Sequence, residues 1–332
     1  MTNPRLVVYS AKAYDRTAFD AALGLEPEID IEYYDVRLTP ATASLAAGAD
    51  AVCAFVNDDV GAVVLDALDT RGVRVVALRC AGYNNVDIGH AHEIGLPVVR
   101  VPAYSPNAVA EHTLAMILSL NRHIHRAYNR VRDGNFALDG LVGFDMAGKT
   151  TAVIGTGNIG AIVARLLWHL RCNVLAVDPY DDEHLVQLGV EYTDLDTALA
   201  AADIVSLNCP LTPETHHLID RAAIARMRPG VMLVNTGRGA LVDTGAVIDG
   251  LKSGRVGSVA LDVYEEEGDL FFEDRSQELL LDDTFARMLT FPNVLITAHQ
   301  AFLTHEALDA IATTTIGNVL NVVNGEECPN AI

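Results

Sequence analysis

Three polar residues far apart in the sequence have the side chains needed to reduce a carbonyl group: Arg238, Glu267 and His299. An imidazole changes charge near neutral pH, so His299 is suited to donate a proton. A neighbouring carboxylate would stabilise the protonated ring, and Glu267 is the candidate for that role. The guanidinium of Arg238 is always charged and forked, which suits it to hold a carboxylate. Given a hydride donor, the three predict reduction of a 2-oxo acid.

A glycine-rich stretch near the middle of the chain provides a site for such a hydride donor. Gly155, Gly157 and Gly160 follow the G-x-G-x-x-G spacing and come directly after the apolar run of residues 152–154. A helical apolar pattern follows, and a second apolar run, residues 174–177, ends at an aspartate. Strand, turn, helix, strand and acid in this order predict a dinucleotide-binding βαβ unit.

Each part of this unit has a physical role. Gly155 allows a tight turn, Gly157 lets the backbone approach a pyrophosphate, and Gly160 lets the helix pack closely on the strand. The positive end of the helix then faces the phosphates. Asp178 is expected to accept hydrogen bonds from both ribose hydroxyls, and its charge would repel a 2′-phosphate, which favours NAD over NADP. The alternative is a glycine-rich turn in an unrelated α/β protein.

The candidate catalytic residues all follow apolar runs that are expected to form strands. Because the carboxyl ends of parallel strands form the ligand-binding edge of an open α/β sheet, Arg238, Asp262, Glu267 and His299 are expected to converge there. The alternative is that they are scattered surface charges with a salt bridge or two. The expected strands of this half of the chain, besides the two above, are residues 204–207, 231–235, 259–261 and 294–297.

The first hundred residues show the same alternation of strands and helices, which predicts a small α/β domain with a parallel sheet. The tail, residues 307–332, includes a helical stretch that is expected to return to this domain and make it discontinuous. Its expected strands are residues 6–9, 31–34, 51–55, 75–78 and 97–101, with a helix over 14–23 and further helices between the strands.

Between the two α/β patterns, the sequence predicts one long helix from Pro106 to about residue 132, since a serine that can cap it precedes the proline. The apolar stretch 114–120 is a candidate subunit interface. Three histidines lie on this helix, and we expect exposed or capping side chains rather than a metal site; they are His112, His123 and His125.

Composition excludes several classes of protein. The 332 residues are 50% hydrophobic, enough for two domains with sizeable cores. A net charge of −21 argues against a nucleic-acid or acidic-membrane partner. Five scattered cysteines without a C-x-x-C pair suit a reducing cytoplasm and give no zinc spacing, so no metal is expected. The N-terminus does not look like a signal peptide, and no apolar run reaches the roughly 18 residues of a membrane span.

Nearly the whole chain resembles the D-2-hydroxyacid dehydrogenases, and among them the fermentative D-lactate dehydrogenases. The resemblance rests on long motifs: VVYSAKAYD, LRCAGYNNVD, VRVPAYSPNAVAEHT, GKTTAVIGTGNIG, DPY, VNTGRGALVD, LDVYEEEGDLFFED, TAHQAFLT and CPN. It implies NAD as cofactor and reversible reduction of pyruvate to D-lactate. It also implies that Arg238 holds the substrate, that His299 donates the proton and that Glu267 pairs with His299.

Further site residues are implied by the resemblance alone. Asp262 is expected to contact the nicotinamide carboxamide, and the backbone near Ala81 and Gly82 to receive the substrate carboxylate. Many relatives carry asparagine where this chain has Thr215, which puts that contact in doubt. The other implied cofactor-binding residues are Gly155, Gly157, Asn158, Ile159, Gly160, Asp178, Cys209, Pro210, Thr236 and Gly237; the substrate-binding set also includes Arg79, Tyr104 and Phe302.

The implied fold is α/β, with two doubly wound, Rossmann-like parallel-sheet domains and a cleft between them. Residues 1–102 with 301–332 would form the substrate domain and residues 103–300 the NAD-binding domain, with hinges near Pro102 and Ala301. The NAD-binding domains are expected to pair into a homodimer or a dimer of dimers.

Two alternatives to a lactate dehydrogenase remain open. The segment between Glu267 and His299 holds paired aromatic residues, Phe271 and Phe272, and resembles the lactate-specific members, although most of its charges fit a solvated loop. A relative that reduces a bulkier 2-oxo acid, such as 2-oxoisocaproate or phenylpyruvate, is one alternative. A non-catalytic NAD-sensing protein is the other, and the intact Arg238, Glu267 and His299 set argues against it.

Overall fold

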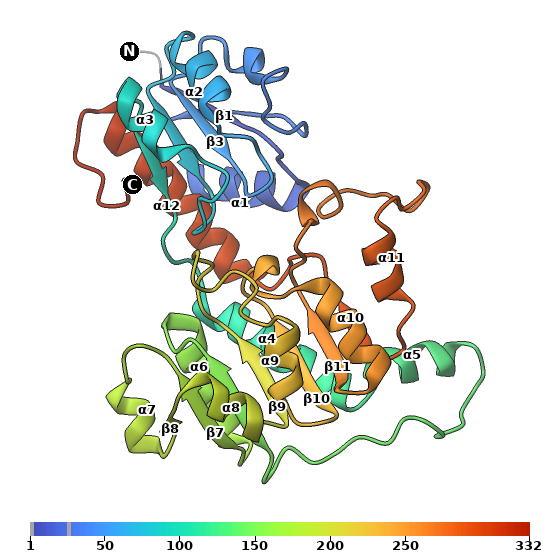
Figure 1. Ribbon diagram of the computed structural model, residues 1–332. Coiled ribbons are helices and arrows are strands. Elements are labelled where there is room, and N and C mark those ends of the chain that lie inside the picture. The colour runs from blue at the N-terminus through green and yellow to red at the C-terminus, as the bar shows by residue number, and fades with distance from the viewer. Residues whose placement is uncertain (1–2, 25–27) are drawn as a thin grey trace. The chain divides into compact units, whose positions relative to one another are not determined.

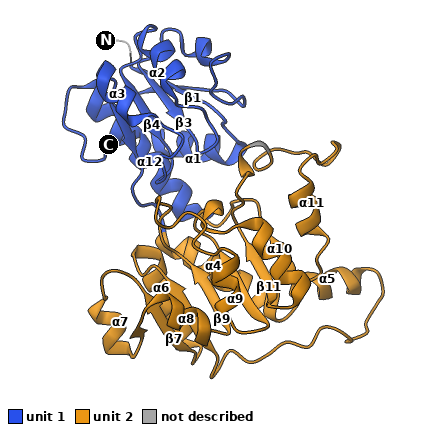
Figure 2. Cartoon of the chain, viewed as in Figure 1, with its two compact units in different colours: residues 1–105, 303–332 blue, residues 106–302 orange. Residues whose placement is uncertain are grey.

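A computed structural model describes residues 3–24 and 28–332. The chain divides into two compact units, shown in two colours in Figure 2: unit 1 is Met1–Ser105 with Leu303–Ile332, and unit 2 is Pro106–Phe302. The predicted domain boundaries stand a few residues away, after residues 102 and 300. No helix in the described part of the chain has the length and apolar character needed to cross a membrane.

Unit 1 is a five-stranded parallel sheet with the strand order β2-β1-β3-β4-β5. Every residue of β3 and β4 is buried, as expected for a parallel sheet with helices on both faces. The strands are β1 (Arg5–Val8), β2 (Asp30–Tyr33), β3 (Ala51–Ala54), β4 (Val75–Leu78) and β5 (Val98–Arg100). The helices are α1 (Ala13–Leu23), α2 (Ala62–Asp69), α3 (Ile88–Ile94) and α12 (His305–Val323), with a 3-10 turn at Ala43–Ala46.

The C-terminal helix α12 belongs to unit 1, as the sequence predicts. It packs against α1 and the strands β3, β4 and β5 (Figure 1). The last residues then pair with the sheet, since Arg100 N–H donates to the Asn330 carbonyl and Ile332 N–H to the Val98 carbonyl. The helix expected between β2 and β3 is reduced to the 3-10 turn at Ala43–Ala46.

Unit 2 is a seven-stranded parallel sheet with the order β12-β11-β10-β9-β6-β7-β8. The chain builds outward from β6 in both directions, so β6 and β9 flank the topological switch point where open α/β sheets bind ligands. The strands are β6 (Thr150–Ile154), β7 (Asn173–Val177), β8 (Glu191–Tyr192), β9 (Ile204–Leu207), β10 (Val231–Asn235), β11 (Val256–Leu261) and β12 (Val294–Ile296). All of the strands expected in this half of the chain are present.

Alternate residues of β6 point to two separate cores. Ala152 and Ile154 join one hydrophobic cluster and Val153 joins the other, so helices cover both faces of the sheet. The helices are α4 (Pro106–Asn121), α5 (Ile124–Arg132), α6 (Asn158–His169), α7 (Glu183–Leu188), α8 (Leu195–Ala201), α9 (Arg221–Arg226), α10 (Thr244–Ser253) and α11 (Asp283–Leu289), with 3-10 turns at Gly239–Leu241 and Glu267–Asp269.

The prediction of one helix over residues 106–132 is wrong. The chain breaks between α4 and α5 at His123, whose φ of 52° is left-handed and cannot continue a right-handed helix. Within the predicted interface stretch 114–120, Met116, Ile117 and Leu120 are buried in the core of unit 2, where α4 packs on α6. Ala115 is exposed and Leu114 and Leu118 are partly buried, so an interface at this stretch stays a prediction.

Candidate active site

The predicted pair of Glu267 and His299 is in contact in unit 2. Glu267 begins the 3-10 turn after β11, and His299 follows β12, the next strand of the sheet. His299 Nδ1 lies 2.7 Å from Glu267 Oε1. A carboxylate only accepts hydrogen bonds, so Nδ1 carries the hydrogen and Nε2 is the nitrogen that exchanges a proton with a substrate.

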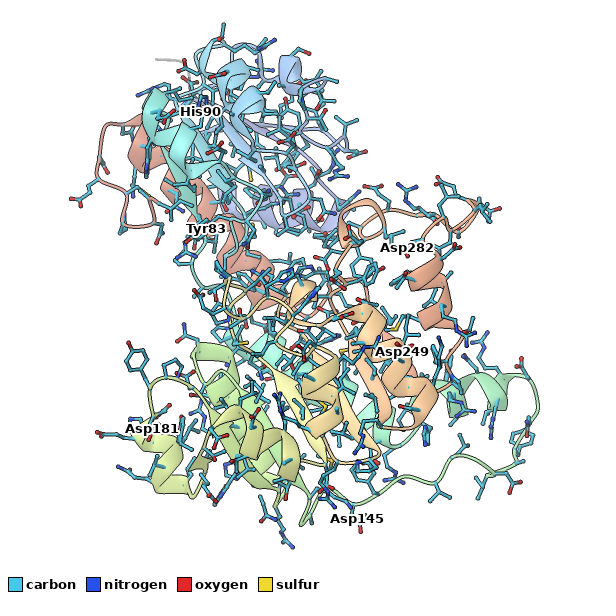
Figure 3. All side chains as sticks on the ribbon, viewed as in Figure 1. Tyr83, His90, Asp145, Asp181, Asp249 and Asp282 are labelled. Atoms are coloured by element: carbon cyan, nitrogen blue, oxygen red, sulfur yellow. The ribbon has the colours of Figure 1, made fainter. Side chains whose placement is uncertain are left out.

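The second oxygen of Glu267 fixes the carboxylate in place. Oε2 accepts a hydrogen bond of 3.0 Å from the backbone N–H of Tyr264, and the Tyr264 hydroxyl donates to Asp282 at 2.7 Å. Asp282, labelled in Figure 3, caps the start of α11. The side chains of His299 and Glu267 are only 18% and 19% exposed, so partial exclusion of water strengthens their interaction.

Asp262 anchors the turn that carries His299. Its buried carboxylate accepts hydrogen bonds from the Thr297 hydroxyl at 2.5 Å and from the backbone N–H groups of Gln300 and Ala301, both at 2.9 Å. Its backbone carbonyl accepts the His299 N–H at 2.7 Å. These bonds hold His299 at a φ of 51°, a left-handed conformation that is uncommon outside glycine.

The donors around Asp262 also decide its charge state. Burial alone would raise the pKa of this carboxyl, but hydrogen bonds from His112, Thr297 and the two backbone amides outweigh it and hold the pKa below its usual value. With its oxygens occupied by protein donors, Asp262 is a structural anchor, and its contact with the nicotinamide stays a prediction.

His112 is a site residue that the sequence pattern does not identify. The expectation of an exposed or capping side chain is wrong for it, because its Nε2 lies 3.2 Å from Thr297 Oγ1 and 3.4 Å from Asp262 Oδ1. Helical periodicity places residue 112 on the inner side of α4 but does not identify a partner so distant in the sequence.

Arg238 lies on the turn that follows β10. Asn235 shapes this turn, since its side chain accepts the Gly237 N–H at 3.0 Å and donates to the Arg238 carbonyl at 2.8 Å. Among the described residues Arg238 forms no ion pair; its Nη1 donates only to the Gly237 carbonyl at 2.8 Å. Its guanidinium therefore retains donors for a ligand carboxylate.

The turn of Arg238 packs directly against the turn of Glu267. A Cβ atom at Gly239 would lie 2.1 Å from the carbonyl carbon of Tyr264, so only glycine permits this approach. Unit 2 thus brings the three predicted catalytic residues to one edge of its sheet, although no direct contact joins Arg238 to the other two.

The glycine-rich turn has the geometry of an anion cradle at the switch point. Gly155 has a φ of 89°, and a Cβ there would lie 2.6 Å from the Cys209 backbone nitrogen. A Cβ at Gly160 would lie 1.8 Å from the Gly155 oxygen, whereas one at Gly157 meets nothing within 4 Å. Gly157 caps the start of α6, so the open space lies at the positive end of a helix.

Asp178 lies beside this turn. One carboxylate oxygen accepts the Thr156 N–H at 2.7 Å, and the other accepts the Tyr180 N–H at 3.0 Å. The acid is therefore already oriented next to the phosphate cradle, as a ribose-binding residue needs to be. Glycine turn, helix start and acid together fit a dinucleotide.

The remaining predicted cofactor residues line the same edge. Burial raises the pKa of Cys209, which packs on Gly155, to about 11. The Thr215 hydroxyl donates to the Pro210 carbonyl at 2.7 Å and is therefore occupied within its own loop.

Thr236 is buried and shares a hydrogen bond of 2.7 Å with Thr113 of α4. Asn158 and Ile159 open α6 next to Gly157. Their contacts with the cofactor stay predictions.

Phe271 and Phe272 have different surroundings. Phe271 is buried with Tyr264 and Phe285 in a small aromatic cluster. The ring of Phe272 lies 5.8 Å from the ring of His299, so the acidic segment between Glu267 and His299 places an aromatic side chain beside the proposed proton donor.

In unit 1, the loop after β4 carries the predicted carboxylate-binding backbone. Within the described residues the N–H groups of Ala81 and Gly82 donate no hydrogen bond, which leaves them available to a ligand. The Ala81 carbonyl is held by Arg100 Nη1 at 2.7 Å, and the Arg100 guanidinium lies over the ring of Tyr83, labelled in Figure 3.

Arg79 is enclosed within unit 1. Its side chain is 1% exposed, its Nη2 donates to the Ser10 carbonyl at 2.8 Å, and its Nε lies 3.3 Å from Asp15 Oδ1. This burial argues against the predicted contact of the Arg79 side chain with the substrate, because its guanidinium instead ties β4 to α1. Tyr104 is half-buried in unit 1 and Phe302 is buried at the end of unit 2, and their substrate contacts stay predictions.

Comparisons with known proteins identify the family of this chain. The family model for the NAD-binding domain of the D-isomer specific 2-hydroxyacid dehydrogenases matches residues 114–301. The chain is 52% identical to D-lactate dehydrogenase of Escherichia coli (strain K12) over 331 residues, 99% of each chain. It is 49% identical to 2-hydroxyacid dehydrogenase A of Aspergillus oryzae over 99% of this chain and 95% of that protein.

Solved structures give the same result. The apo-structure of D-lactate dehydrogenase from Escherichia coli aligns with a TM-score of 0.91 at 50% identity over 99% of both chains. The Aquifex aeolicus D-lactate dehydrogenase, complexed with NAD and lactic acid, aligns with a TM-score of 0.86 at 32% identity over 97% of this chain and 96% of that one. This chain therefore belongs to the D-isomer specific 2-hydroxyacid dehydrogenases and is an NAD-dependent oxidoreductase.

Proposed function

We propose that this enzyme interconverts pyruvate and D-lactate, using NADH and NAD. The observation that carries the proposal is the hydrogen bond of 2.7 Å between His299 Nδ1 and Glu267 Oε1. It lies on the sheet edge that also carries the glycine turn and Arg238. The names of the relatives support the choice of substrate. The chain is 52% identical, over 99% of its length, to a protein named D-lactate dehydrogenase, and 50% identical, over the same share, to a solved structure of that name.

Each residue of this set has one task. The bound nicotinamide supplies the hydride. His299 delivers a proton from Nε2 to the substrate carbonyl oxygen, and Glu267 stabilises the protonated ring before transfer. Arg238 holds the substrate carboxylate with its free donors. In the direction of lactate oxidation, His299 accepts the hydroxyl proton at the same nitrogen.

A small substrate is favoured by the aromatic side chain next to His299. The Phe272 ring lies 5.8 Å from the imidazole of His299, so a substrate held next to His299 would have less room for a large substituent on its 2-oxo acid. The methyl group of pyruvate needs the least space of the three substituents, which supports pyruvate over 2-oxoisocaproate or phenylpyruvate.

The test is an assay of NADH oxidation with pyruvate, 2-oxoisocaproate and phenylpyruvate, followed by chiral analysis of the product. We expect the highest kcat/KM with pyruvate, and D-lactate as the product. A higher kcat/KM with a bulkier acid would reassign the substrate, and no turnover with any 2-oxo acid would refute the enzymatic role. The His299→Ala variant measures the background of the assay.

We further propose that the enzyme is a homodimer or a dimer of dimers, paired through unit 2. The segment formed by α5 and residues 133–149 exposes large apolar side chains, which are between 54% and 86% exposed: Ile124, Tyr128, Val131, Phe136, Leu138 and Val142. Apolar side chains exposed together mark interaction surfaces. Light scattering after size exclusion would test this, and Tyr128→Asp should yield monomers if the segment is the interface.

We also propose that the enzyme acts in the cytoplasm. All five cysteines are unpaired, which suits a reducing compartment. Fractionation of cells that express the tagged chain would test this location.

A further inference from the structure

We propose that His112 is a positioning residue for the reaction: it holds the turn that carries His299, acting through Thr297 and Asp262. The inference rests on the proposed function, since it concerns the orientation of the proposed proton donor. All four residues lie in unit 2, so their arrangement belongs to one compact body.

The three side chains form a continuous chain of polar contacts. His112 comes from α4, which packs along β11 and β12, the strands that lead to Asp262 and to Thr297. His112 Nε2 lies 3.2 Å from Thr297 Oγ1, and Thr297 Oγ1 lies 2.5 Å from Asp262 Oδ1. The imidazole is also 3.4 Å from the same carboxylate oxygen.

Counting protons gives the direction of these bonds. The Thr297 hydroxyl has a single proton, and the short contact to a carboxylate that cannot donate uses it. The lone pairs of Thr297 then accept from His112, so His112 carries its hydrogen on Nε2. The thioether of Met116, 3.8 Å from the same hydroxyl, is a weak acceptor and does not compete.

The end of this chain of contacts is the backbone of the proposed proton donor. The Asp262 carboxylate holds the N–H groups of Gln300 and Ala301, and its carbonyl holds that of His299. His299 has a left-handed φ of 51°, and a non-glycine residue keeps such a conformation only where its surroundings fix it. Loss of the His112 hydrogen bond frees Thr297 to rotate and loosens the carboxylate that anchors this turn.

The contacts of His112 support no other role. Its Nε2 is directed to Thr297 and Asp262, so it is not the proton donor to a substrate. A purely structural role would lower the melting temperature without changing the chemical step. The positioning role predicts a slower chemical step in a protein that is still folded.

The test compares His112→Leu with His112→Gln, whose amide keeps a donor, and with His169→Leu as control. His169 is exposed at the end of α6 and touches none of these residues. We expect His112→Leu to lower kcat for pyruvate by about 10- to 100-fold, the cost of a misplaced catalytic group, while NADH still binds. The primary isotope effect with 4-deuterated NADH should rise. His112→Gln should recover most of kcat, and His169→Leu should match the wild type.

Two outcomes would overturn the inference: wild-type kcat and isotope effect in His112→Leu, or equal losses in His112→Leu and His112→Gln, which would indicate packing alone. Should His112→Leu fail to fold, Thr297→Val tests the same chain of contacts. Where His112→Leu folds, the double variant His112→Leu/Thr297→Val should be no slower than the slower of the two single variants, because both changes act along one path; additive losses would count against the proposal.

A readout independent of turnover separates this inference from the proposed function. The Nδ1–H proton resonance of His299 in NMR spectra reports its bond to Glu267. We expect the resonance to persist in His112→Gln and to broaden or shift in His112→Leu. If the wild type turned over no 2-oxo acid, the proposed function would fail, and this resonance would still decide whether His112 positions His299; an unchanged resonance in His112→Leu would refute it.

Discussion

His299 Nδ1 and Glu267 Oε1 are 2.7 Å apart, although 32 residues separate the two in the sequence. The contact exists because β11 and β12 are parallel neighbours and both residues follow the carboxyl ends of these strands. The second Glu267 oxygen is held by the Tyr264 N–H, so the carboxylate is fixed before any ligand binds.

Replacing Glu267 by glutamine tests the electrostatic part of this relationship. The amide keeps the size of the side chain but removes the negative charge that favours the protonated imidazole. Since pyruvate reduction needs protonated His299, the profile of kcat/KM against pH should move to lower pH, with a lower maximum. An unmoved profile would show that the carboxylate does not set the charge of the ring.

Replacing His299 by alanine removes the proposed proton donor. We expect kcat for pyruvate to fall by on the order of 10²- to 10⁴-fold, the usual contribution of a general acid. NADH affinity, measured by fluorescence, should remain, because the glycine turn and Asp178 lie elsewhere on the sheet edge. Unchanged turnover would assign the proton to another group.

The convergence of the catalytic residues could be predicted from sequence because it depends on a general property of parallel sheets. Apolar runs mark the strands, and polar residues directly after them must lie at one edge. The glycine motif can also be recognised from the sequence alone, because its three glycines lie within six residues between an apolar run and a helical pattern. These features need only the order of residues along the chain.

Other features depend on contacts between distant residues. No glycine or proline marks the break at His123, so the apolar pattern continues through it. Arg79 follows a strand, as ligand-binding residues do, yet its position opposite Asp15 of α1 encloses it. His112 reads as one polar residue on an apolar helix, and only the packing of α4 on β11 and β12 gives it Thr297 and Asp262 as neighbours.

Gly157 and Gly160 offer a matched pair of alanine substitutions. A Cβ at position 160 would lie 1.8 Å from the Gly155 oxygen, so Gly160→Ala should destabilise unit 2 by about 1–3 kcal/mol, the cost of overpacking. A Cβ at position 157 meets nothing within 4 Å, and its φ of −64° suits alanine. Gly157→Ala should therefore keep the melting temperature and weaken NADH binding. If Gly157→Ala lowered the melting temperature and left NADH binding unchanged, while Gly160→Ala kept its stability, the proposed phosphate site at this turn would be contradicted.

Asp178→Ala should relax the preference for NADH over NADPH. The carboxylate is the negative charge that a 2′-phosphate would meet beside the glycine turn, where Thr156 and Tyr180 N–H groups orient it. Without it, those two donors become available to a phosphate. The ratio of kcat/KM for NADPH to that for NADH should rise, and a ratio at or below the wild-type value would place the ribose elsewhere.

Cys209 offers a test that does not depend on turnover. Burial raises the pKa of its thiol to about 11, so at pH 7 only roughly one molecule in 10⁴ carries the reactive thiolate. Alkylation by a maleimide should be slow at pH 7 and rise about tenfold per pH unit up to the pKa. Because Cys209 packs on Gly155, bound NADH should slow the reaction further. Labelling of the Cys209→Ser variant under the same conditions shows which part of the maleimide signal comes from Cys209 and which from the other cysteines. Fast labelling at neutral pH would contradict the raised pKa, and no protection by NADH would mean that Cys209 does not line the cofactor site.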